Sequence, residues 1–278
     1  MDVLTIPFTD PLLREALLAG VLVGIAASVV GAFVVLRGLA FVGDALAHGV
    51  LPGIAAAVLL GVSSMIGALA GGIVMMVGVT AITRRTRLSG DTAIGLLFVG
   101  MLALGVVITS RSASFSGDIT RILFGDLLGI TRGDLVVQAV ATGLVLLVAG
   151  VCARPFLLLS IDPDRATVAG FPAGRYHVIM LALITVTVVV SFQAVGTLLV
   201  FGMLIAPPAT AALYARRLPM MMGAAAIISA VSVWAGLVLS FQYRLAAGAT
   251  IVLVQVAVFF VALLIHRPRT APAPQVVG

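Results

Sequence analysis

The chain has 278 residues, of which 62% are hydrophobic and only 9% are charged, and its formal net charge is +6. A soluble domain usually carries about 25% charged residues, so the composition excludes an ordinary soluble protein. Apolar runs of roughly 20 residues between short polar breaks predict an all-α polytopic membrane protein. A β-barrel would show shorter, alternating segments instead. The basic pI reflects arginines scattered near helix ends, which indicates membrane topology and no nucleic-acid partner.

The beginning of the chain predicts a retained membrane span. The first apolar run follows the acidic, polar residues 1–16, and no small-residue cleavage site follows that run. We therefore expect no signal peptide. The apolar runs that follow predict eight or nine transmembrane helices in one membrane domain, residues 1–266, and a disordered Pro-rich tail, residues 267–278. The predicted spans are 12–36, 39–61, 63–83, 91–110, 134–152, 176–193, 195–215, 219–240 and 248–266.

The sixth and seventh spans are joined by almost nothing, at "SFQAVGTLL", so one of them is expected to be short or broken. Eleven of the 16 arginines fall in one set of connections, which the positive-inside rule places in the cytoplasm. The C-terminus is then cytoplasmic, and nine spans place the N-terminus outside. The cytoplasmic set comprises Arg37, Arg84, Arg85, Arg87, Arg154, Arg165, Arg175, Arg216, Arg217, Arg267 and Arg269.

The residue types exclude two kinds of chemistry. All 16 basic residues are arginine, and a Walker A phosphate loop requires a lysine. The chain is therefore expected to lack a nucleotide-binding site and not to be an enzyme. Any ATP-driven role would need a separate ATPase subunit. The single cysteine, Cys152, excludes an intrachain disulfide.

Two connections are too long for simple turns. The outer connection, residues 111–133, contains an amphipathic stretch around residues 119–128 that predicts a short interfacial helix. The inner connection, residues 153–175, contains "DPDRATVAG", which predicts a short capped helix. Asp162 can cap this helix, Pro163 suits its first position, and Gly170 can end it.

The second span, in "GLAFVGDALAHGVLPG", carries the ionisable residues Asp44 and His48. If the helix starts near Leu39, Asp44 lies roughly 7 Å and His48 roughly 13 Å along it. Burying a charge there costs a few kcal/mol, so such residues are usually functional. Residues four apart share one helix face. A carboxylate and an imidazole on one face suit Zn²⁺, Mn²⁺ or Fe²⁺.

Pro52 predicts a bend just after this pair, because its missing N–H frees the carbonyl of His48. One Asp and one His are too few ligands for a divalent ion, since tetrahedral zinc takes four. A homodimer with this helix at its two-fold axis would supply two of each. The alternative stays open that Asp44 and His48 bond mainly to each other and fix helix packing.

Four blocks of sequence resemble the permease subunits of the zinc/manganese/iron ABC importers. They are "LRGLAFVGDALAHGVLPG", "DTAIGLLFVGMLALGVVITS", "ILFGDLLGIT" and "SFQAVGTLLVFGMLIAPPATAALYARR", in the family's order. The resemblance covers nearly the whole chain. It implies a homodimer similar to the type II ABC importers, two ATPase subunits bound inside, and a metal-carrying solute-binding protein docked outside.

The resemblance also assigns residues. The family's Asp-x-x-x-His pair maps onto Asp44 and His48. Its inner coupling helix, which would sit in the ATPase groove, maps onto residues 160–172 through Asp162, Pro163, Asp164 and Ala166. Two departures are Ala47, where the family often has serine, and Asp126, where a neutral residue is frequent.

We therefore expect the transmembrane subunit of a divalent-metal importer in a bacterial or archaeal plasma membrane. Its metal would be transported substrate, and no cofactor would be bound permanently. Asp44 and His48 of two protomers would form a gate or transient site during alternating access. The alternatives are a secondary metal/proton transporter that uses the same pair and a permease for metal chelates. A membrane metalloprotease is disfavoured, because a His-Glu-x-x-His cluster is missing.

Overall fold

The computed structural model describes residues 11–110, 125 and 127–266. Across these residues nine segments are long and apolar enough to cross a membrane, which confirms the predicted α-helical membrane fold with nine candidate spans. The tail 267–278 and most of the predicted helix around 119–128 lie outside the described residues. The described end of that loop forms one short 3₁₀ helix, η2 (Leu127–Gly129).

The helices follow the apolar runs of the sequence closely and differ from the predicted spans at two places. One span is divided into α3 and α4, and the sixth and seventh spans form the single interrupted helix α11. In chain order the helices are α2 (Pro11–Leu36), α3 (Ala40–Gly49), α4 (Leu51–Leu59), α5 (Ser64–Arg85), α6 (Gly90–Thr109), α8 (Arg132–Val151), α9 (Ala153–Ile161), α10 (Pro163–Val168), α11 (Ala173–Ala212), α12 (Leu218–Tyr243) and α13 (Ala247–Ile265).

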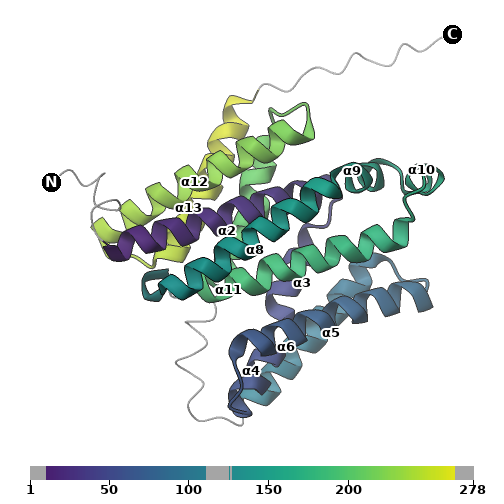
Figure 1. Ribbon diagram of the computed structural model, residues 1–278, viewed down its shortest axis with the longest axis horizontal. Coiled ribbons are helices and arrows are strands. Elements are labelled where there is room, and N and C mark those ends of the chain that lie inside the picture. Colours follow the sequence, from purple (N-terminus) through teal and green to yellow (C-terminus); the bar gives the residue numbers. More distant parts are fainter. Residues whose placement is uncertain (1–10, 111–124, 126, 267–278) are drawn as a thin grey trace.

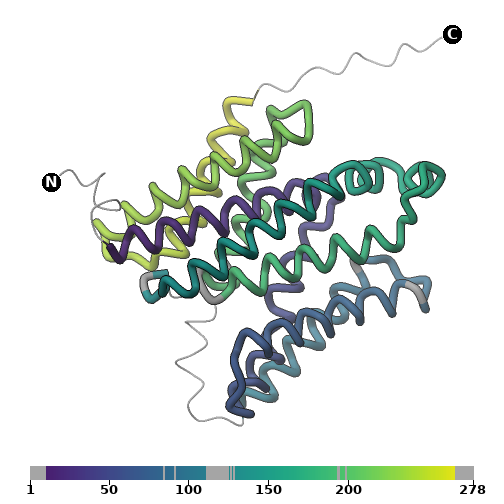
Figure 2. Tube along the Cα trace, viewed as in Figure 1, coloured from purple at the N-terminus to yellow at the C-terminus, as the bar shows by residue number. Residues whose placement is uncertain are grey.

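Helices α2 and α11 form the centre of the bundle. Helix α11 contacts α2, α3, α5, α8, α12 and α13, and Figures 1 and 2 show α8, α12 and α13 beside this pair. Glycine allows the close approach: a Cβ added at Gly31 would overlap the carbonyl oxygen of Leu204, and one at Gly20 would meet Val233. Small residues at helix crossings are the usual means of close packing in membranes.

Helices α4, α5 and α6 form a second group, drawn in blue at the bottom of Figure 1. Gly53 of α4 and Gly67 of α5 cross back to back, and a Cβ on either residue would overlap the other's carbonyl oxygen. Helix α3 contacts α6 of this group and α11 of the central group. The candidate metal ligands on α3 therefore lie where the two groups meet.

Helix α11 is interrupted at Gly196, where the backbone leaves the helical region with φ 74° and ψ 163°. Gly196 is the second residue of the candidate span Val195–Ala212, four residues after the end of the preceding candidate span, Ala173–Phe192. Gly125, which also has a positive φ of 71°, lies against the backbone of Val195 and Gly196. Because the sixth and seventh apolar runs form one interrupted helix with almost no connection between them, the sequence alone predicted either eight or nine spans.

Candidate metal site and coupling segment

Asp44 and His48 lie on the partly exposed side of α3. Their neighbours Ala45, Leu46 and Ala47 are buried against the bundle, whereas the side chains of Asp44 and His48 each remain 25% exposed. The predicted shared face is therefore present. The pair borders open space and is accessible to an ion or to another chain.

The geometry of the pair fits two uses. His48 Nε2 lies 3.4 Å from Asp44 Oδ1, which is longer than the roughly 2.7–2.9 Å of a strong charged hydrogen bond. Two ligands held at about 2.1 Å around a tetrahedral metal ion lie about 3.4 Å apart. The separation suits two ligands of one metal ion, and it also permits a direct but weak ion pair. Both interpretations made from the sequence are therefore compatible with the structure.

Phe98 of α6 restricts the imidazole of His48. The two rings meet edge to face with centroids 5.8 Å apart, and Phe98 makes a similar contact with Phe41 at 5.7 Å. The Nδ1 atom of His48 is buried and has no hydrogen-bond partner among the described residues. The nitrogen near Asp44 is thus the one available for chemistry. The sequence did not identify Phe98, because its contact with His48 depends on how α6 packs against α3.

The span that carries the pair is divided at Val50, two residues after His48. Helix α3 ends at Gly49 and α4 begins at Leu51, so that Pro52 is the second residue of α4. Its missing N–H costs little there, because the first amides of a helix have no intrahelical acceptor. Val50 itself keeps helical backbone angles, φ −78° and ψ −18°, and the bend expected from Pro52 stays a prediction. Asp44 and His48 lie on a helix of only ten residues.

Two candidate ligands are fewer than a typical metal site needs. Among the described residues no three His, Cys, Asp or Glu side chains gather closely enough to hold a metal ion. Within this part of the chain, Asp44 and His48 remain a pair, whereas tetrahedral zinc takes four ligands.

The capped helix of the long inner connection is α10, and its ends are as predicted. Asp162 Oδ1 accepts hydrogen bonds from the amides of Asp164 at 3.0 Å and Arg165 at 3.1 Å. Pro163 is the first helical residue. At the other end Gly170 has φ 86°, and the amide of Phe171 donates to the carbonyl of Ala166 at 2.9 Å. This closure is a Schellman motif.

Helix α10 presents an exposed face. Ala166 is fully buried, whereas Val168 is 90% exposed and Ile161, just before α10, is 74% exposed. Figure 1 shows α9 and α10 projecting at one end of the bundle, beside the start of α11. Apolar residues this exposed at the end of a membrane bundle are suited to contact another protein.

A polytopic helical bundle with an Asp–His pair inside one of its spans is the arrangement expected of a membrane transport protein. More specifically, the chain belongs to the ABC 3 transport family, whose sequence profile matches residues 9–266. The resemblance inferred from the sequence is thereby confirmed.

Two curated relatives match nearly the full length of the chain. The manganese transport system membrane protein MntC of Halalkalibacterium halodurans is 40% identical over 250 residues, which are 90% of this chain and 86% of the relative. The chelated iron transport system membrane protein YfeD of Yersinia pestis is 37% identical over 261 residues, 94% of this chain and 87% of the relative.

Two solved structures share the fold. PsaBC from Streptococcus pneumoniae, in complex with Fab, superposes with a TM-score of 0.83 at 34% identity, covering 93% of each chain. An inward-facing conformation of a putative metal-chelate type ABC transporter gives a TM-score of 0.74 at 17% identity, covering 94% of this chain and 91% of that one. The second likeness concerns the fold alone.

Proposed function

We propose that this chain is the membrane-spanning subunit of an ATP-driven importer of divalent transition metal ions, with manganese or iron as cargo. The observation that carries the proposal is the Asp44–His48 pair, which borders open space on α3 at a separation suited to two metal ligands. Family membership and the manganese and chelated-iron relatives support this cargo. They do not favour a secondary transporter. The donor set is also compatible with zinc.

The transport site is shared by two protomers. Asp44 and His48 are each 25% exposed on a membrane-spanning segment, and facing a carboxylate toward lipid costs a few kcal/mol. A second copy of α3 across a two-fold axis would cover both side chains and supply the missing ligands. Such a site contains four protein ligands, and it comes apart when the protomers separate. Transport needs this property, because the ion must leave as readily as it enters.

ATP is hydrolysed by a separate subunit. The chain contains no lysine and therefore no Walker A loop. The exposed face of α10, which includes Asp164 and Val168, would enter a groove of the ATPase and act as the coupling helix. Asp162, Pro163, Ala166 and Gly170 would set its shape and its attachment to the bundle.

The arginine distribution sets the orientation of the subunit. The end of the bundle with α9, α10 and the start of α11 would face the cytoplasm of a bacterium or archaeon, together with the C-terminus. The opposite end, with η2 and the start of α8, would receive a metal-carrying solute-binding protein. The chain would function in the plasma membrane as a homodimer with two ATPase subunits.

The test uses the whole transporter in proteoliposomes with its ATPase and binding protein. We expect Asp44→Ala and His48→Ala each to lower the uptake of radiolabelled manganese about tenfold or more, the loss typical even of outer-shell metal partners. Basal ATP hydrolysis should persist. His266→Ala is the matched control, because it removes an imidazole that lies just after α13, against the ring of Tyr214.

Two results would count against the metal site. Normal manganese uptake by both variants would show that Asp44 and His48 do not form a transport site. A lowered melting temperature with unchanged uptake per folded molecule would instead assign the pair to helix packing. Orientation is measured separately, by labelling a cysteine placed in α10 from either side of the membrane.

A further inference from the structure

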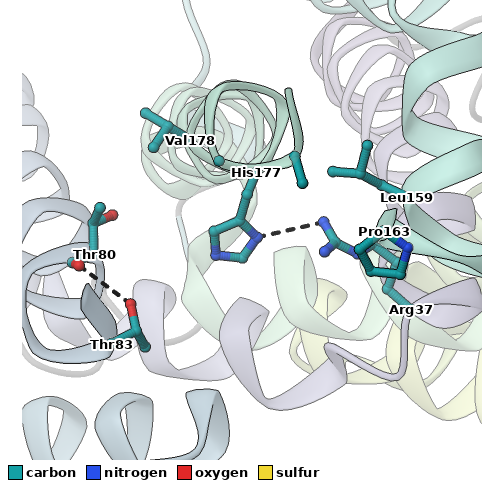
Figure 3. A pocket seen from close by; sticks show the side chains of 9 residues that line it. Arg37, Thr80, Thr83, Leu159, Pro163, His177 and Val178 are labelled. Carbon is teal, nitrogen blue, oxygen red and sulfur yellow. Dashed lines mark hydrogen bonds between the residues drawn. The ribbon is translucent and has the colours of Figure 1, made fainter. Parts of the chain in front are cut away.

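A cavity of about 270 Å³ lies at the end of the bundle that carries α10. Four elements meet around it: the end of α2, the last turns of α5, the α9–α10 region and the start of α11. Figure 3 shows Arg37 and His177 pointing toward each other and joined by a hydrogen bond, with Thr80 and Thr83 on the far side of His177. The lining residues are Arg37, Thr80, Thr83, Leu159, Pro163, Ala173, Gly174, His177 and Val178.

Arg37 gives the cavity a positive charge without a matching acid. Its Nη1 donates to His177 Nδ1 at 3.4 Å and contacts Met180 Sδ at 3.5 Å. No described carboxylate forms an ion pair with Arg37. Partial burial lowers the pKa of Arg37, but a guanidinium group stays charged in proteins. A half-buried cation that forms no ion pair with a described carboxylate favours an anion beside it.

The remaining wall adds positive potential. Ala173 and Gly174 are the first residues of α11, and no side chain caps this helix start. The first amides of a helix have no intrahelical acceptor, and the helix dipole favours negative charge there. By contrast, the hydroxyl groups of Thr80 and Thr83 already donate to carbonyls of α5, at 2.8 and 2.9 Å. Arg37 is thus the main donor, and the start of α11 reinforces it.

We propose that this cavity binds a phosphate oxyanion, supplied by an anionic phospholipid headgroup or by free phosphate. Its volume lies below the roughly 300–1,000 Å³ of pockets for drug-sized ligands, which suits a small anion. Arg37 follows the last residue of the α2 span and Ala173 begins the first span of α11. Membrane spans end near the layer of lipid phosphates.

An acidic side chain of a docked protein fits the cavity less well. Pro163 is the one α10 residue in the wall, whereas Asp164, Arg165, Thr167 and Val168 are exposed. A protein that docks on α10 has that exposed surface available. The cavity lies instead between α10 and the ends of the membrane helices.

The test measures lipid and phosphate binding by the full-length chain in a neutral detergent. Native mass spectrometry counts retained phosphatidylglycerol, with phosphatidylcholine as the uncharged-headgroup reference, and a second arm titrates inorganic phosphate alone. Arg37→Gln should weaken anion binding about tenfold, the loss expected for a charged hydrogen-bonding group. Arg37→Lys should recover part of it. Arg175→Gln is the matched control, because it removes an exposed arginine from the same end of α11.

Each outcome decides the proposal. Arg37-dependent binding of phosphatidylglycerol identifies the lipid as the source, and Arg37-dependent binding of inorganic phosphate alone identifies free phosphate. If Arg37→Gln and Arg175→Gln bind both probes equally, the site does not exist. If Arg37→Gln changes only the copurification of the ATPase, the anion is a protein side chain and the proposal is wrong. If Arg37→Gln has a lower melting temperature than the unsubstituted chain, His177→Gln is tested in its place. The assay contains no transition metal, so its result is independent of the proposed transport function.

Discussion

Replacing Gly196 by alanine should destabilise the protein, because α11 turns there through a conformation that side chains exclude. Gly196 has φ 74° and ψ 163°, in a region that is populated almost only by glycine and costs other residues about 1–3 kcal/mol. Since 1.4 kcal/mol is a factor of ten, the ratio of folded to unfolded protein should fall about 5- to 150-fold. Gly196→Asn should be destabilised as well, because the ψ of Gly196 lies far from the left-handed helical region that asparagine tolerates.

The assay is urea unfolding of the purified chain in detergent, followed by helical circular dichroism. Gly100→Ala is the matched control: Gly100 lies in α6, has no positive φ, and would have no atom within 4 Å of an added Cβ. In an ordinary helix this change stabilises by up to about 1 kcal/mol. The two variants should therefore shift in opposite directions. Equal shifts would refute the claim that α11 needs glycine at its interruption.

Three further predictions concern the site and the end of the bundle. Phe98→Leu should weaken manganese binding severalfold while the melting temperature changes little, because the contact that orients His48 is lost; calorimetry and melting separate the two effects. Asp162→Ala should destabilise α10 by about 0.5–2 kcal/mol, seen as faster amide exchange in residues 163–168, whereas Asp162→Asn should retain most protection. Burial raises the pKa of Cys152, so maleimide at mildly alkaline pH should label the native chain more slowly than the unfolded chain; equal rates would contradict this.

Local sequence patterns predicted most of the fold. Apolar runs of bilayer length located the spans to within a few residues, because every backbone polar group in a bilayer must be satisfied within a helix. The ends of α10 were predicted equally well. Asp162, Pro163 and Gly170 act through bonds to residues two to five positions away, so their effect is already contained in a short stretch of chain.

Contacts between distant segments could not be predicted in this way. Arg37 and His177 are 140 positions apart, and nothing in the sequence around either residue indicates the other. Phe98 meets His48 only because α6 packs against α3. For Asp44 and His48, spacing predicted that both would lie on one side of a helix, but it does not determine how many further ligands join them.

A series of packed elements joins the proposed ligands to the proposed coupling helix. Helix α3 carries Asp44 and His48 between the turn at Arg37–Leu39 and Val50. Gly43, next to Asp44, lies against Leu204 in the second half of α11. The first half of α11 starts beside α10, and Gly196 separates the two halves. If α10 binds an ATPase as proposed, its displacement would therefore reach the ligands through α11.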